Sequence, residues 1–75
     1  MAKYDNVRID GITFKPGEQW FLIRAQDRFA PAAVDAYAQL VSETVPDVVL
    51  TEIRGIAEQM RQWQAQHPEH VKTPD

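Results

Sequence analysis

The segment 20–27 reads Trp-Phe-Leu-Ile-Arg-Ala-Gln-Asp, and it decides the fold that the sequence predicts. Four large apolar residues run without interruption into an arginine, an amide and a carboxylate. A continuous apolar run of this kind predicts a strand that is buried on both faces. We therefore expect a strand over 19–25, with its polar residues at the end where the chain turns into a helix, a natural place to bind a ligand or a partner.

Alternation along this strand assigns its side chains to two faces. The first face comprises Phe21, Ile23 and Ala25, and the second comprises Trp20, Leu22, Arg24 and Gln26. The first face suits packing against a helix, whereas the second begins apolar and becomes polar. Because two helices cannot cover both faces in so small a monomer, we expect a homo-oligomer with the second face or the strand edge at the subunit contact.

Composition limits the classes of protein that the chain can belong to. It has 75 residues, a net charge of −3 and no cysteine. A single small domain over 1–75 buries only about 60% of the surface that its unfolded chain exposes, and such chains often self-associate. The missing cysteine excludes disulfides and thiolate metal sites. The acidic balance argues against duplex nucleic acid as a partner, because neutralising phosphates requires a basic excess.

No segment of the sequence predicts export or insertion into a membrane. The N-terminal residues lack the apolar core of a signal peptide, and no apolar run approaches the length of a membrane span. We expect a cytoplasmic protein without a membrane partner. Residues 1–6 are expected to be flexible, and 67–75 to form an irregular tail because they are rich in proline and polar residues.

Short apolar segments precede the central strand. Residues 7–9 and 12–14 flank Asp10-Gly11, a dipeptide that is favoured in tight hairpin turns. They predict a small hairpin or an extended arm. Residues 15–18, Lys-Pro-Gly-Glu, predict a further turn.

Two helices are predicted after the strand. The first begins near Pro31 and ends before Pro46, and the second runs from Pro46 to a residue before Pro68. Gly55, in the middle of the second helix, suggests a close approach of another backbone. The predicted fold is therefore α+β: a short N-terminal β-element, one central strand and an antiparallel two-helix hairpin.

The candidate binding residues lie at the end of the strand and on the first helix. Arg24 offers a planar fork of donors for phosphate or carboxylate, and Gln26 and Asp27 can recognise polar edges. Trp20 or Tyr37 can stack on a flat base. The alternative is a purely structural role, in which Arg24 pairs with Asp27 and Asp27 caps a turn through Arg28 and Phe29.

Other patterns carry less chemistry. His67 and His70 have a metal-like spacing, but Pro68 argues against a shared helical face and a zinc site needs three or four ligands. We therefore expect no metal and no cofactor. The sequence has no catalytic motif, which predicts a protein that is not an enzyme. Arg54, Glu58 and Arg61 are interpreted as a solvated helix face.

The chain resembles a family of small phage and prophage proteins. The resemblance lies in the segment 20–27, Ala30-Pro31, Tyr37-Ala38, Met60, Trp63-Gln64 and the C-terminal Lys-Thr-Pro-Asp of residues 72–75. Phe29 departs from the leucine expected at that position. The resemblance implies a phage setting and not a particular activity.

Small phage proteins without catalytic motifs commonly act by binding. By analogy, we expect a non-enzymatic protein that sequesters an anionic, nucleotide-like ligand, such as a signal of bacterial immunity, at Arg24, Gln26, Asp27, Trp20 and Tyr37. The alternative is an inhibitor that binds a host defence or regulatory protein. A structural virion or assembly factor is a third possibility.

Overall fold

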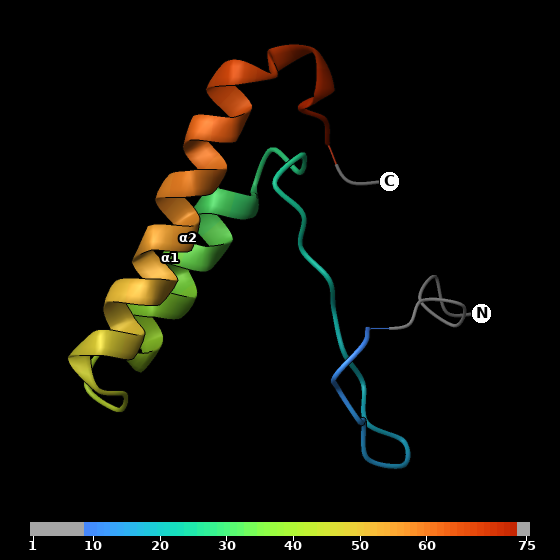
Figure 1. Cartoon of the computed structure of the whole chain (residues 1–75), viewed down its shortest axis with the longest axis vertical. Helices are drawn as coiled ribbons and strands as arrows, with labels where there is room; N and C mark the ends of the chain where they lie inside the picture. The colour runs from blue at the N-terminus through green and yellow to red at the C-terminus, as the bar shows by residue number, and fades with distance from the viewer. Residues whose placement is uncertain (1–8, 74–75) are drawn as a thin grey trace.

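The computed structural model describes residues 9–73, and its centre is an antiparallel hairpin of two helices (Figure 1). Helix α1 spans Ala30–Val41 and helix α2 spans Asp47–Gln66. A single 3₁₀ turn, η1, follows over Pro68–His70. Within the described residues, no helix combines the length and the apolar character needed to cross a membrane.

The predicted two-helix hairpin is confirmed, and proline sets its boundaries. Pro31 lies in the first turn of α1, where its missing N–H leaves no hydrogen bond unmade. Pro46 is the N-cap of α2, and Asp47 places a negative charge at the positive end of that helix. Helix α2 ends two residues before Pro68. These local signals explain why both helices lie close to their predicted ranges.

The contact between the helices is built on alanine. Ala30 and Ala38 of α1 and Ala57 of α2 are buried, whereas no large side chain among the described residues is fully buried. Small side chains allow two helices to approach closely, but they remove little apolar surface from water. The hairpin therefore buries little apolar surface for its length.

Gly55 does not mark a close approach to any of the described residues, which corrects the prediction made for it. A Cβ placed on Gly55 would meet no atom within 4 Å. The glycine therefore weakens the interior of α2, and residues 9–73 offer no packing reason for it.

The predicted α+β class is wrong. Residues 9–73 contain no β-strand, and their only β-type pairing is an isolated parallel bridge between Asp27 and Lys72. A strand needs a neighbouring strand to complete its backbone hydrogen bonds. The apolar run 20–23 has the composition of a strand, but the described part of the chain supplies no ladder for it.

The pattern of buried and exposed side chains along residues 20–25 also differs from the two faces predicted for the strand. Phe21 of the expected core face is 71% exposed, while Ile23 and Ala25 are half-buried. Trp20 is half-buried and Leu22 is exposed. The segment is thus an extended connection with part of its apolar surface turned outward.

The turn predicted at 15–18 is present. The N–H of Glu18 donates to the carbonyl of Lys15 over 3.0 Å, and Gly17 has a φ of 75°, which only glycine adopts readily. Phe14 precedes this turn and Trp20 follows it. Their rings stack on each other, with centroids 5.3 Å apart. A turn also forms at Asp10-Gly11, where Ile12 donates to Ile9. The remainder of the expected hairpin, 7–8, and the expected flexible N-terminus, 1–6, lie outside the described residues.

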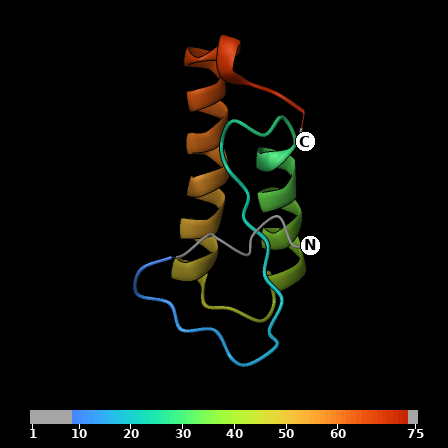
Figure 2. The same cartoon turned by 90° about the vertical axis from the view of Figure 1, so that its right-hand side faces the viewer.

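Residues 9–25 form an arm that runs along one side of the hairpin. Figure 1 shows the arm beside the two helices, and Figure 2 shows it passing in front of them. At its upper end the arm turns into α1, close to the tail that follows α2. Among residues 9–73, this junction holds several hydrogen bonds that lie outside the helices.

Candidate functional site

The tail returns to the start of α1 and pairs with it; we call this pairing the clasp. The N–H of Arg28 donates to the carbonyl of Lys72 over 2.8 Å, and the N–H of Lys72 donates to the carbonyl of Gln26 over 2.9 Å. These two bonds make the parallel bridge between Asp27 and Lys72. They join positions more than forty residues apart, and they hold the tail that follows α2 against the start of α1.

The side chain of Gln64 reinforces the clasp from α2. Its amide nitrogen Nε2 donates to the carbonyl of Ala25 over 2.9 Å and to that of Asp27 over 2.8 Å. Both bonds are partly buried, so the two carbonyls would be poorly hydrated without the amide. Gln64 therefore fixes the end of the arm against α2.

Asp27 makes the turn into α1. Its carboxylate Oδ1 accepts a hydrogen bond from the N–H of Phe29 over 2.8 Å, and its carbonyl accepts one from the N–H of Ala30 over 3.0 Å. A short acidic side chain that accepts from the backbone two residues on stabilises such a turn. Within the described residues, Arg24 forms no ion pair with Asp27.

The five predicted site residues occupy two parts of the structure. Arg24 is exposed and lies directly before the clasp, while Gln26 and Asp27 belong to it and are half-buried. Trp20 lies further along the arm and stacks against Phe14. Tyr37 lies on α1, and within residues 9–73 no hydrogen bond or ring contact joins it to the other four.

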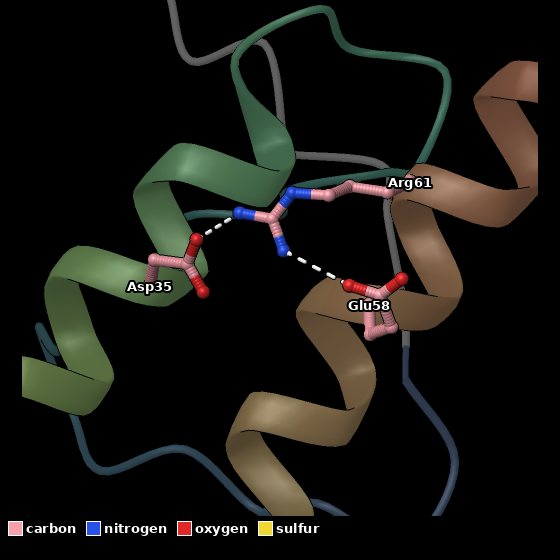
Figure 3. Close-up of polar contacts among 3 residues, drawn as sticks. All are labelled: Asp35, Glu58 and Arg61. Atoms are coloured by element: carbon pink, nitrogen blue, oxygen red, sulfur yellow. Dashed lines mark hydrogen bonds and ion pairs between the residues drawn. The ribbon is translucent and has the colours of Figure 1, made fainter.

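An ion pair bridges the two helices and was not anticipated from the sequence. Arg61 of α2 reaches Asp35 of α1, and it also lies 3.5 Å from Glu58 in the preceding turn of its own helix (Figure 3). The hydrogen bond to Asp35 raises the pKa of the Arg61 guanidinium above its ordinary value. Asp35 is the only charged residue of α1, so its pairing with Arg61 of α2 neutralises the one charge that this helix carries.

The two histidines contact an aromatic ring at the end of α2. The ring of His67 stacks on Trp63, with centroids 4.6 Å apart, and its Nδ1 lies 3.0 Å from the Trp63 carbonyl, which can only accept. His70 lies tilted against both rings. No group of three or more metal-ligating side chains occurs in the part of the chain that the structure describes.

Several large apolar side chains are also exposed. Those that are substantially exposed among the described residues are Ile12, Phe21, Leu22, Phe29, Tyr37, Leu40, Val48, Val49 and Ile56. Single exposed apolar residues are ordinary, but adjacent ones indicate contact surfaces. Three groups stand out: Phe21 with Leu22 on the arm, Phe29, Tyr37 and Leu40 along α1, and Val48 with Val49 at the start of α2.

Sequence reasoning missed the clasp and the outward face of α1. The clasp uses backbone groups, which leave no mark in the sequence, and Gln64 looked like one of several polar residues on α2. The face of α1 did leave a signal, because the helix is apolar on every side apart from Asp35 and Gln39. A helix that is apolar all round is expected to be buried all round.

We compared the chain with protein-family models, with curated proteins and with solved structures, and none of these comparisons gave a match. The function is therefore inferred from the residues and contacts described above.

Proposed function

We propose that this chain is a small non-enzymatic phage protein that binds another protein, and that it occupies part of the surface of a defence or regulatory protein in the cytoplasm of the bacterial host. The observation that carries the proposal is the exposure of its large apolar side chains, set against a described core of three buried alanines. The phage setting follows from the resemblance of the segment 20–27 and of the C-terminal tail.

The arm is the part of the chain best suited to contact a host protein. Phe21 is 71% exposed and Leu22, the next residue, is 39% exposed, so one short segment presents two apolar side chains to solvent. Large aromatic side chains dominate the binding energy of protein interfaces when they enter a pocket. The clasp and Gln64 fix one end of the arm, which lowers the entropy lost on binding.

A co-purification experiment tests this proposal. The tagged full-length chain is used to recover proteins from a lysate of a bacterial host, in parallel with the double variant F21S/L22S. The matched control is T13S, at an exposed position of the same arm. We expect one host protein in stoichiometric amount with the wild type and with T13S, and its loss with F21S/L22S. Recovery of no stoichiometric host protein would reject the proposal, and so would equal recovery by all three proteins.

A second candidate function is binding of an anionic, nucleotide-like ligand, and one observation favours it. Arg24 is exposed, and its guanidinium forms no ion pair within residues 9–73, so its donors remain available to a phosphate. Gln26 and Asp27 follow it directly. Against this candidate, Asp27 already accepts a backbone hydrogen bond, and one ring face of Trp20 is stacked on Phe14.

Calorimetry against a panel of linear and cyclic nucleotides tests the second candidate. Arg28 provides the matched control, because it is a second exposed arginine four residues further on. We expect binding by the wild type and by R28A, and loss of binding by R24A. Absence of heat with every nucleotide would reject this function, as would equal binding by R24A.

A further inference from the structure

The outward side of α1 carries an apolar stripe that runs the full length of the helix. With 3.6 residues per turn, Phe29, Ala33, Ala36 and Leu40 fall within a sector of about 60°, opposite the buried Ala38. Tyr37 borders this sector. Phe29 is 56% exposed, Tyr37 57% and Leu40 82%, and both alanines are exposed as well. We call these five residues the outer stripe.

We propose that a second copy of this chain packs on the outer stripe, with the two α1 helices antiparallel about a twofold axis. The positions 29, 33, 36 and 40 have the alternating four- and three-residue spacing of a helix–helix contact. Their order is large, small, small, large, and it reads the same from either end. In an antiparallel pair, Phe29 of each copy therefore meets Leu40 of the other, and the alanines face one another at the centre.

This symmetry is what a twofold contact between identical chains requires. In such a contact the same patch serves both subunits, so residue i of one copy meets residue j of the other and the reverse. An unrelated partner would place no such demand on the order of residues in the stripe. The outer stripe therefore suits a second α1 better than a surface of different sequence.

The charge of the helix points to the same partner. None of the five residues is charged, and Asp35, the only charged residue of α1, is paired with Arg61 on the hairpin. Two copies can therefore approach through this face without like charges meeting, although each chain has a net charge of −3. The small side chains of Ala33 and Ala36 allow the helix backbones to come close at the centre.

Sedimentation equilibrium at micromolar concentration tests the proposal on the full-length chain. We expect the wild type to have twice its chain mass of 8.6 kDa. L40E places a charge on the stripe and should give a monomer with unchanged helical content by circular dichroism, because Leu40 makes little contact within its own chain. Q39E adds the same charge one residue away, off the stripe, and should remain a dimer. A monomeric wild type would overturn the proposal, as would equal masses for L40E and Q39E.

Thiol cross-linking tests the antiparallel register of the two α1 helices. The chain has no cysteine, so the introduced thiols are the only ones that can react. When the single variants F29C and L40C are mixed and oxidised, the mixed disulfide should form in preference to either symmetric one. V48C, at an exposed position of α2, should form none with F29C. Equal yields from all pairs would overturn the antiparallel register. The arm variant F21S/L22S should remain a dimer, so this proposal and host-protein binding can fail separately.

Discussion

The side-chain amide of Gln64 and the backbone carbonyl of Asp27 are joined by a hydrogen bond of 2.8 Å, which connects the last turns of α2 to the turn that begins α1. The same amide nitrogen donates to Ala25. One side chain thus links the arm, the start of the first helix and the end of the second. The arm is held in place at this junction and not by a sheet.

Removal of the Gln64 amide should destabilise the chain measurably. In Q64A the carbonyls of Ala25 and Asp27 lose a partly buried donor, so the free energy of unfolding in urea should fall by about 1 to 3 kcal/mol. Q62A is the control, because Gln62 is exposed on the same helix, and its effect should stay within about 0.5 kcal/mol. Equal effects of the two variants would show that the hydrogen bonds of Gln64 do not support the arm.

Enlargement of the alanine contact should also lower stability. Ala57 is fully buried, so A57L inserts a large side chain where the helices approach closely, at a cost of about 1 to 3 kcal/mol. A65L makes the same change at an exposed position of α2 and should cost less than about 0.5 kcal/mol. Urea unfolding of both variants checks this, and an A57L protein as stable as A65L would contradict the narrow helix contact described here.

Two glycines should respond oppositely to the same substitution. Gly55 lies inside α2 with open space around its Cβ position, so G55A should stabilise the chain by about 1 kcal/mol. Gly17 has a φ of 75°, which strains any residue with a Cβ, so G17A should destabilise it. Thermal unfolding of the pair distinguishes them. A destabilised G55A would mean that another surface packs closely on that side of α2.

The pair of Asp35 and Arg61 should show the salt dependence of an exposed ion pair. D35N should lower the urea midpoint in dilute buffer, and the difference from wild type should shrink in molar sodium chloride. E58Q, which removes the weaker contact of Arg61, should have the smaller effect. A difference for D35N that persists in high salt would contradict an electrostatic origin.

The pH dependence of this pair follows from the direction of the shift. Because the hydrogen bond to Asp35 raises the pKa of Arg61 further above its already high ordinary value, the contribution of the arginine is fully present at neutral pH and is lost only in strongly alkaline solution. Titration of Arg61 should therefore leave stability unchanged across neutral pH. A loss of the D35N difference between mildly acidic and mildly alkaline buffer would contradict this assignment.

Local signals explain the part of the fold that the sequence predicts correctly. Pro31, Pro46 and Pro68 mark where the two helices begin and end. The turn around Gly17 is equally local. Each of these features depends on residues within a few positions of one another.

Long-range pairing explains what the sequence does not reveal. The apolar run 20–23 predicts a strand by composition, but a strand exists only where another segment completes its ladder, and none is present in residues 9–73. The bonds from Gln64 span 37 and 39 residues and end on backbone carbonyls, which carry no sequence signal. Among the predicted site residues, Arg24, Gln26 and Asp27 lie together only because they are close in sequence. Tyr37 belongs to the outer stripe.

The most direct test of the central claim, that the exposed apolar faces of this chain are contact surfaces, is an isotope-filtered nuclear Overhauser experiment on a mixture of labelled and unlabelled chains. Phe29 and Leu40 lie eleven residues apart on one helix, about 16 Å along its axis, so a contact between them cannot arise within one chain. We predict intermolecular signals between the ring of Phe29 and the methyl groups of Leu40. Their absence at concentrations where the chain is folded would contradict the account.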